Sequence, residues 1–247
     1  MMHCNNIIVA MHKCQAFFMK NIFITGVNRG IGFFLTKELL KRGHSVIGTY
    51  RKSSDNNNLQ KLKSAFPKTL NLTCLDVQVL EQDELTRYLN SFRAVDILIN
   101  NAGILDCGNV SFEKLQIDDL LRSIQVNTLG PMKITQLLLP KLTESASPRV
   151  FHMTSQMGSI TDNQSGGYYF YRISKAALNM FNKSFSQDYP HIPSIVIHPG
   201  WVRTDMGGNH APISPEDAAI SVSDLLLTAK NLSSGNFYNY KGEILPW

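Results

Sequence analysis

Tyr171 and Lys175 are the two side chains whose types and spacing most directly indicate proton chemistry in this chain. Residues four apart on a helix lie on the same face, one turn from each other. A tyrosine ordinarily has a pKa of about 10, and a neighbouring ammonium stabilises the phenolate and lowers that pKa. A pair of this kind can therefore exchange a proton with an alcohol or carbonyl oxygen.

The alternative is a surface pair with no chemical role, because the chain contains 8 tyrosines and many lysines. Tyr168 and Tyr169 lie close by and compete with Tyr171 as candidates. Of the three, only Tyr171 is followed four residues later by a lysine. The spacing favours Tyr171, but the pair alone does not assign an activity.

A glycine-rich turn, Thr-Gly-Val-Asn-Arg-Gly-Ile-Gly at residues 25–32, follows a short apolar run at 22–24. Its first glycine permits a tight turn, its second permits close approach of a ligand, and its third lets a helix pack closely on the strand. The helix start would present free N–H groups and the positive end of its dipole to a phosphate. The spacing differs from the commonest dinucleotide fingerprint, so a glycine-rich turn between any strand and helix remains the alternative.

Apolar patterning divides the chain into alternating strands and helices. It predicts strands at 22–24, 45–50, 70–75, 95–99, 149–154 and 194–198. It predicts helices from the glycine turn to about residue 42 and at 59–66, 80–92, 118–142, 169–188 and 215–229, with an edge strand in the tail 235–247. Residues 19–247 are therefore predicted to form one α/β domain, a doubly wound parallel sheet of the Rossmann type. Residues 1–18 are interpreted as an N-terminal extension without an assigned role.

Polar or glycine-containing clusters stand at the carboxyl ends of the predicted strands. Ligands bind at this edge of an open parallel sheet, so we expect the clusters to converge on one crevice. The clusters are Thr25-Gly26, Arg51, Asp76, Asn101, Ser155 and Pro199-Gly200.

The composition argues against several classes of function. The net charge is +5, and no basic run indicates a nucleic-acid partner. No apolar run is long enough to cross a membrane. The 4 cysteines form no Cys-x-x-Cys, and no His/Cys cluster has metal-ligand spacing, so we expect no metal and reduced thiols in the cytoplasm.

Taken together, the motifs resemble those of the short-chain dehydrogenase/reductase family over roughly residues 20–247. The resemblance is closest to the C-factor and sniffer-type carbonyl reductases, through local matches at 166–172, 198–202, 206–208 and 239–247. The family motifs are found, in the family's order, at Thr25-Gly26-x-x-x-Gly30-Ile31-Gly32, Asp76, Asn100-Asn101-Ala102-Gly103, Asn127, Ser155, Tyr171-x-x-x-Lys175 and Pro199-Gly200.

The resemblance implies an NADP(H)-dependent enzyme that reduces a carbonyl, or oxidises the corresponding alcohol. Tyr171 would be the general acid, Lys175 would lower its pKa and hold the nicotinamide ribose, and Ser155 would hydrogen-bond the substrate oxygen. Asn127 would anchor a water linked to Lys175, although an ordinary helix-interior amide is the alternative. Thr154 and Ser159 are the alternatives to Ser155. Ser155 is favoured because it stands directly after the predicted strand. The implied cofactor-binding residues are Gly26, Asn28, Arg29, Gly30, Ile31, Gly32, Arg51, Asp76, Val77, Asn101, Ala102, Gly103, Tyr171, Lys175, Pro199, Gly200, Val202 and Thr204.

Two arginines favour NADPH over NADH. NAD-selective folds place an acid at the end of the second strand, where it binds the ribose 2′-hydroxyl. Here Tyr50 and Arg51 stand at that point, and Arg51 can offer a charged fork to a 2′-phosphate. Arg29 can approach the same group from the glycine turn. The alternative is that both are ordinary surface arginines.

Two departures from the family pattern bear on the substrate. The Ser155–Tyr171 separation is longer than in most members, and the extra loop 162–167 could reshape the substrate entrance. The segment 204–215 is short, which predicts an open site. A C-factor-like signalling protein with little turnover is the alternative function, although the intact catalytic set argues for an enzyme. Family habit implies a homodimer or homotetramer.

Overall fold

The protein is described here from a computed structural model, which describes residues 19–52, 56–79, 91–105, 108–228 and 232–247. The predicted extension 1–18 and most of the predicted helix 80–92 lie outside the described residues. Among the described residues, no helix combines the length and the apolar character that crossing a membrane requires.

The described residues form one seven-stranded sheet in which every neighbouring pair is parallel. The strand order is β3-β2-β1-β4-β5-β6-β7, so the direction of winding reverses between β1 and β4. This confirms the predicted doubly wound sheet, with the tail strand at its edge. The strands are β1 (Asn21–Thr25), β2 (Ser45–Tyr50), β3 (Leu70–Cys74), β4 (Ile97–Asn100), β5 (Arg149–Met153), β6 (Ser194–His198) and β7 (Phe237–Asn239).

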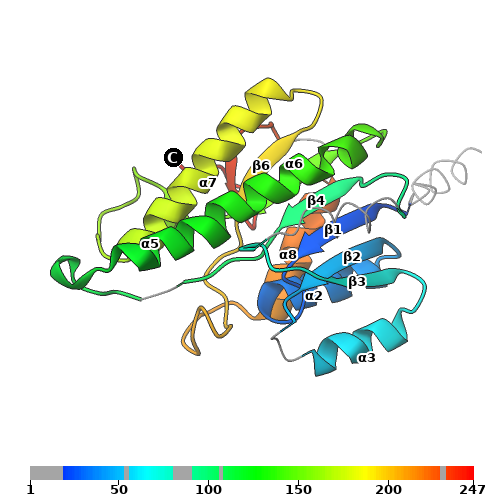
Figure 1. The fold of residues 1–247 in the computed structure, drawn as a ribbon, viewed down its shortest axis with the longest axis horizontal. Coiled ribbons are helices and arrows are strands. Elements are labelled where there is room, and N and C mark those ends of the chain that lie inside the picture. The colour runs from blue at the N-terminus through cyan, green and yellow to red at the C-terminus, as the bar shows by residue number, and fades with distance from the viewer. Residues whose placement is uncertain (1–18, 53–55, 80–90, 106–107, 229–231) are drawn as a thin grey trace, which may run out of the picture.

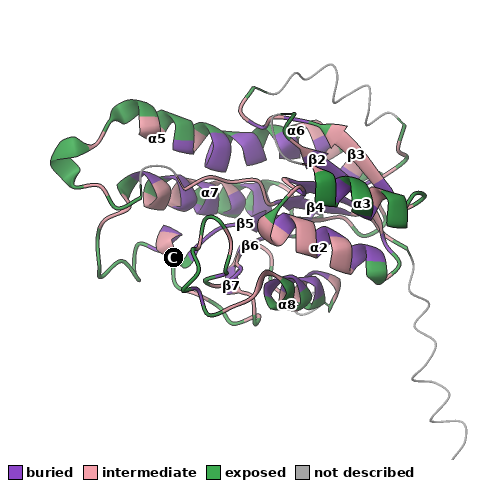
Figure 2. Ribbon diagram, turned by 90° about the horizontal axis from the view of Figure 1, so that it is seen from below, coloured by how far each residue is buried: buried purple, intermediate pink, exposed green. Residues whose placement is uncertain are grey.

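Helices cover both faces of the sheet (Figures 1 and 2). One face carries α2 (Gly30–Lys41), α3 (Asn57–Ala65) and α8 (Pro215–Thr228). The other carries α5 (Ile117–Ile124), α6 (Gly130–Thr143) and α7 (Tyr169–Asp188). Two short 3₁₀ turns, Phe112–Lys114 and Gln156–Gly158, lie in the connections.

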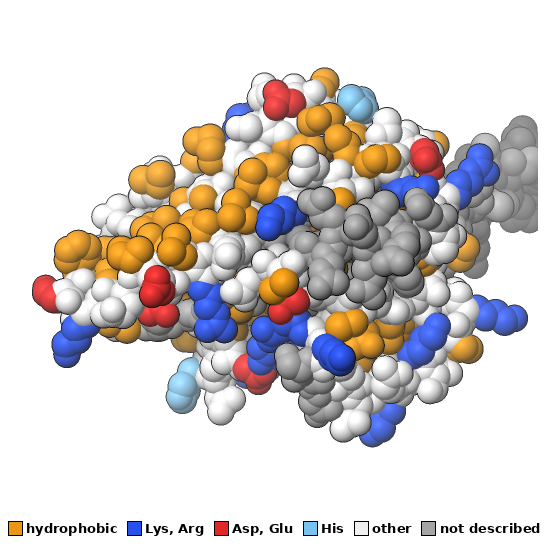
Figure 3. All heavy atoms as spheres, in the orientation of Figure 1, with side chains coloured by type: hydrophobic (Ala, Val, Ile, Leu, Met, Phe, Trp, Pro, Cys, Tyr) orange, Lys and Arg blue, Asp and Glu red, His pale blue; other side chains and the backbone are white. Residues whose placement is uncertain are grey.

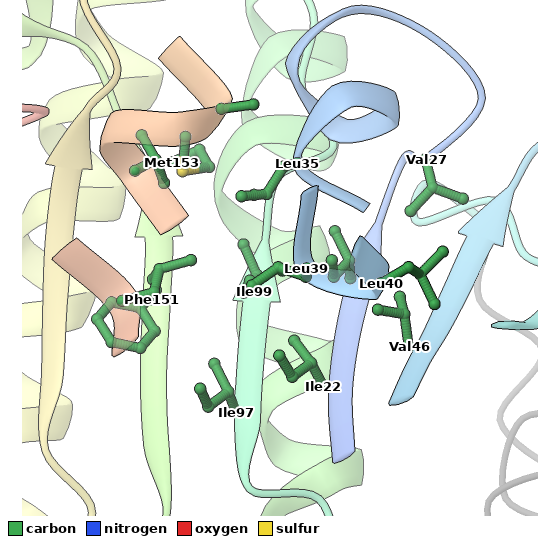
Figure 4. Packing of buried hydrophobic residues seen from close by; sticks show 14 of the residues in the cluster. Ile22, Val27, Leu35, Leu39, Leu40, Val46, Ile97, Ile99, Phe151 and Met153 are labelled. Carbon is green, nitrogen blue, oxygen red and sulfur yellow. The ribbon is translucent and has the colours of Figure 1, made fainter. Parts of the chain in front are cut away.

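Alternate residues of the central strands supply the two cores, as expected for a sheet buried on both faces. Ile22 and Ile24 of β1 pack toward α2 and α8, in a cluster that includes Leu35 and Leu39 (Figure 4). Phe23, between them, packs toward α6 and α7. This double burial fixes β1, and with it the start of the glycine-rich turn.

The predicted helix 118–142 is interrupted. A π-helical turn, Gln125–Leu129, separates α5 from α6 and contains the buried Asn127. Such turns insert one extra residue into a helix and are frequent at functional sites. Apolar periodicity does not predict them, because the hydrophobic stripe continues through the insertion.

Candidate active site

A cavity of about 560 Å³ opens at the carboxyl ends of the strands, beside the point where the strand order reverses. It brings together residues that the sequence spreads over more than 170 positions. Four predicted site residues, Asn127, Ser155, Gly200 and Val202, do not line it. Those that do are Gly26, Asn28, Arg29, Gly30, Ile31, Gly32, Arg51, Asp76, Val77, Asn101, Ala102, Gly103, Tyr171, Lys175, Pro199 and Thr204.

The glycine-rich turn has the backbone conformation that its sequence predicts. Gly26 and Gly30 have φ angles of +73° and +55°, in the left-handed region that favours glycine. A Cβ on Gly32 would lie 2.2 Å from the Gly26 carbonyl oxygen, so only glycine allows this approach of α2 to β1. Gly30 lines the cavity, and a Cβ there would make an ordinary van der Waals contact with Thr204 Cγ2 at 3.5 Å. The N-terminus of α2 is therefore accessible to an anion from the cavity.

Hydrogen bonds fasten this turn to the end of β4. Thr25 Oγ1 accepts from the main-chain N–H groups of Asn101 and Ala102 at 3.0 and 2.9 Å. The Asn101 side chain donates to the carbonyl oxygens of Thr25 and Gly26 at 2.9 and 3.1 Å. Thr25 and Asn101 thus hold two neighbouring strand ends in register, a role that the sequence interpretation did not give to Thr25.

Tyr171 forms a hydrogen bond with Ser155; Ser155 is buried, and Tyr171 is half-buried and lines the cavity. The two competing hydroxyls are committed elsewhere, because Thr154 donates to Asn179 at 2.7 Å and Ser159 donates to the Trp247 main-chain oxygen at 3.0 Å. The geometry therefore pairs Tyr171 with Ser155 among the candidates.

Lys175 lies below this pair, on the turn of α7 that follows. Its ammonium donates to the Met153 carbonyl oxygen at 2.9 Å and lies 5.7 Å from the centre of the Tyr171 ring. Only 4% of the residue is exposed, and burial lowers the pKa of Lys175 to about 8.

The net shift of the Tyr171 pKa is upward, and the predicted lowering of that pKa by Lys175 remains a prediction. Burial raises the pKa of Tyr171 to about 12, and the hydrogen bond with Ser155 opposes that rise only in part. The physical reason is desolvation, because an enclosed phenolate loses more hydration than these neighbours replace. Tyr171 is therefore protonated at neutral pH and is poised to donate.

The π-helical turn places Asn127 against two other elements. Its Oδ1 accepts from the Ile104 N–H at 2.9 Å, and its Nδ2 donates to the Ile104 carbonyl and to Ser174 Oγ at 2.9 and 3.0 Å. Ser174 Oγ donates in turn to the Tyr171 carbonyl at 2.8 Å. Asn127 thus joins the segment after β4 to the turn of α7 that carries Tyr171 and Lys175. The sequence interpretation missed Ser174, whose position inside the Tyr-x-x-x-Lys spacing was the available clue.

Arg29 and Arg51 both line the other end of the cavity, together with Tyr50. Both are exposed, and no carboxylate follows β2 at residues 50–52. Arg29 Nη1 lies 2.5 Å from Asp205 Oδ2, in an ion pair that joins the glycine-rich turn to the loop after β6. Sequence reasoning did not single out Asp205, because its partner lies 176 positions away.

The Pro199-Gly200 turn carries that loop. A Cβ on Gly200, whose φ is +89°, would lie 2.4 Å from Ile213 Cδ1, and Val202 forms a bridge with Ile213. Gly200 and Val202 therefore shape the loop from behind, and Thr204 faces the cavity from it. Lining residues that the sequence interpretation missed include Gln78, Arg122, Arg203, Asp205 and Met206. Among the described residues, no cluster of three or more His, Cys, Asp or Glu side chains offers a metal site.

Known proteins share this sequence pattern and this fold. Residues 20–212 match the family model described as short chain dehydrogenase. C-signal of Myxococcus xanthus is 43% identical over 162 residues, which cover 62% of this chain and 93% of that protein. The carbonyl reductase Sniffer of D. melanogaster superposes with a TM-score of 0.88 at 31% identity, covering 93% of this chain and 100% of that one. A putative short-chain dehydrogenase/reductase from Burkholderia multivorans with bound NADP superposes with a TM-score of 0.84 at 33% identity, with the same coverage.

Proposed function

The chain belongs to the short-chain dehydrogenase family of oxidoreductases, and we propose that it is an NADPH-dependent reductase of carbonyl compounds, or, in the reverse direction, an NADP⁺-dependent dehydrogenase of the corresponding alcohols. The observation that carries the proposal is the arrangement at the two ends of one cavity. Tyr171 and Lys175 line one end, where Tyr171 is hydrogen-bonded to Ser155, and the glycine-rich turn flanked by two arginines lines the other.

The residues around the cavity fit a dinucleotide. The N-terminus of α2 at Gly30 suits a pyrophosphate, and Arg29 and Arg51 suit the 2′-phosphate of NADPH. The Burkholderia neighbour with bound NADP supports this cofactor. We assign the adenine side to Asp76, Val77 and Asn101–Gly103, and the nicotinamide side to Pro199, Gly200, Val202, Thr204 and Lys175. The bound cofactor would supply the hydride for the carbonyl carbon.

The side chains of this protein would then handle the proton. Tyr171, protonated at neutral pH, donates its proton to the carbonyl oxygen as that oxygen gains charge. Ser155 hydrogen-bonds the same oxygen and stabilises the developing charge. The Lys175 ammonium stabilises the phenolate that remains, and Asn127 keeps Lys175 and the segment at Ile104 in place while anchoring the water that links them to solvent.

Purified protein assayed with a panel of ketones, aldehydes and quinones tests the proposal. We expect oxidation of NADPH that depends on a carbonyl, and no such turnover in Tyr171→Phe. Lys183→Met, an exposed position on the same helix, is the control and should keep full activity. Absence of turnover in the unmodified protein, with NADPH bound, would contradict the enzymatic proposal.

The similarity to C-signal favours one second candidate, a C-factor-like signalling protein that keeps the nucleotide site with little turnover. The buried Ser155 and Lys175 argue against it, because desolvating a lysine has a cost that a pure binding protein need not accept. Tight NADPH binding without carbonyl reduction across the panel would favour this candidate instead.

Assembly as a homodimer or homotetramer and a cytoplasmic location complete the proposal. Exposed apolar side chains gather over α5 and α7, as Figure 3 shows, among them Ile117, Leu121, Ile173 and Met180. Self-association would remove such a surface from water. The exposed free thiol of Cys74 suits a reducing compartment. Light scattering and cell fractionation test the two statements.

A further inference from the structure

Arg172, the neighbour of Tyr171 on α7, reaches back over the loop that connects Ser155 to Tyr171. Its Nε donates to the Gly167 carbonyl at 3.2 Å, its Nη1 to the Met157 carbonyl at 3.3 Å, and its Nη2 to Ser165 Oγ at 2.9 Å. One planar guanidinium therefore fastens both ends of this loop, which follows Ser155 and precedes α7. Among the described residues, Arg172 has no carboxylate partner. Its guanidinium donors therefore hold the loop through hydrogen bonds and do not form an ion pair.

The end of this loop has a backbone that needs such a restraint. Gly166, Gly167 and Tyr168 have consecutive φ angles of +63°, +65° and +47°, and Tyr168 is the one non-glycine residue in this region of φ among the described residues. A left-handed conformation costs a side-chain-bearing residue about 1–2 kcal/mol, and it persists only where its surroundings hold it. The three left-handed residues end three positions before Tyr171, so they set the direction in which α7 begins.

The middle of the loop is held from another side. The Trp247 main-chain oxygen accepts from the Thr161 N–H at 2.9 Å and from Ser159 Oγ at 3.0 Å. The Trp247 ring stacks on Phe237 of the edge strand, with ring centres 5.7 Å apart. These bonds are made by Ser159 and Thr161, whereas Arg172 bonds Met157 and Gly167, which are nearer to Ser155 and Tyr171 in the chain.

We propose that Arg172 is a positioning residue for the carbonyl reduction, which fixes the loop 156–168 so that Ser155 and Tyr171 meet at the same substrate oxygen. The inference rests on the proposed function and deepens it. Both hydroxyls are close to the ends of the loop, and both must reach one atom at hydrogen-bond distance. A displacement of about 1 Å is enough to lower turnover by about 100-fold.

Steady-state kinetics of Arg172→Met and Arg172→Lys test the role. Methionine keeps the apolar stem and removes every donor, whereas lysine keeps one charged donor. We expect Arg172→Met to lower kcat by about 10- to 100-fold, with the Kd for NADPH changed less than twofold, and Arg172→Lys to recover part of the loss. Lys183→Met, on an exposed turn of the same helix, should match the unmodified protein.

The pH dependence of the reaction rate distinguishes a positioning role of Arg172 from a role that only stabilises the fold. The Ser155 hydrogen bond lowers the pKa of Tyr171, so loosening the pair should raise that pKa. In the direction of alcohol oxidation with NADP⁺, where Tyr171 acts as the base, the rising limb of the pH–rate profile should move to higher pH in Arg172→Met. A purely supporting residue would lower the melting temperature and leave kcat per folded molecule and this limb unchanged.

Ser165→Ala keeps the test valid should Arg172→Met fail to fold, because it removes one of the three bonds and leaves the arginine in place. It should show a smaller loss of kcat in the same direction. Unchanged kcat and pH profile in the folded Arg172 variants, or in Ser165→Ala where those do not fold, overturn the inference while the proposed function stands. Absence of carbonyl reduction by the unmodified protein overturns both.

Discussion

The two ends of the cavity differ in the kind of group that they offer to a ligand and in how far those groups are buried. At the glycine-rich turn, residues 25–32 are contiguous, and the groups offered to a ligand are backbone N–H groups and exposed arginines. At the catalytic end, Tyr171 and Lys175 come from α7 and Ser155 follows β5; Ser155 and Lys175 are buried, and Tyr171 is half-buried. Backbone and exposed charge suit recognition of a common cofactor, whereas desolvated side chains suit proton transfer, because burial can shift a pKa by several units.

Tyr171→Phe should give the largest effect and should leave the other end of the cavity intact. Removal of the proton donor is expected to lower kcat by about 100- to 10,000-fold, since general acid catalysis contributes that much. The Kd for NADPH, measured by fluorescence titration, should stay within a few-fold. Near-normal turnover in this variant would falsify the assignment of Tyr171.

Comparison with Lys175→Met should show that burial of Lys175 makes the free energy of unfolding of the unmodified protein depend on pH. The folded pKa of Lys175 is about 8 and the ordinary value is 10.5, so the unfolded chain binds more protons between these values. The unmodified protein should therefore gain stability relative to Lys175→Met as the pH rises from 8 toward 10.5, by up to about 3 kcal/mol. Urea unfolding at several pH values measures this difference, and a constant difference would mean that Lys175 is solvated in the folded protein.

Gly30→Val should damage the cofactor end without altering the catalytic groups. The side chain would lie against Thr204 in the part of the cavity where the pyrophosphate is proposed to lie, and we expect the Kd for NADPH to rise by at least about 10-fold. Its φ of +55° adds strain, so some loss of melting temperature is expected as well.

Gly43→Val is the matched control for that strain. Gly43 also has a left-handed φ, +84°, and nothing lies within 4 Å of a Cβ there. It lies just beyond the far end of α2, so the variant should lose stability and keep its cofactor affinity. Equal changes of Kd in the two variants would show that strain, and not obstruction, is what matters at Gly30.

Arg29→Ala/Arg51→Ala should abolish most of the preference for NADPH over NADH, with kcat for NADPH little changed. The reason is that both arginines line the end of the cavity where the 2′-phosphate is proposed to lie. Steady-state kinetics with the two cofactors measure the ratio of kcat/KM. Equal or better efficiency with NADH in the unmodified protein would refute the preference itself.

Asp205→Asn should give the smallest effect and the opposite sign. Asp205 pairs with Arg29, which the 2′-phosphate would also contact in the proposed binding mode. Removal of the negative charge should tighten NADPH binding a few-fold at low salt, and the effect should fade as salt screens the exposed pair. Weaker binding of NADPH would mean that the ion pair holds the loop over the cofactor.

The sequence predicted whatever depends on local pattern. Strand positions, the parallel sheet and the left-handed glycines of the turn follow from apolar runs and from backbone conformations that only glycine adopts easily. β4 begins at Ile97 and not at Val95, because the Val95 N–H donates to the Lys141 carbonyl of α6 and not to a strand. Such a boundary depends on a partner that local pattern does not reveal.

Only the tertiary structure decided which distant groups share an environment. The ion pair of Arg29 with Asp205 and the three bonds of Arg172 depend on loops whose paths no periodicity specifies. The net direction of the Tyr171 pKa shift depends on the folded chain in the same way. A spacing of four residues places an ammonium nearby, but the sign of the shift depends on how completely the surrounding elements remove water from the phenol, and that is a property of the folded chain.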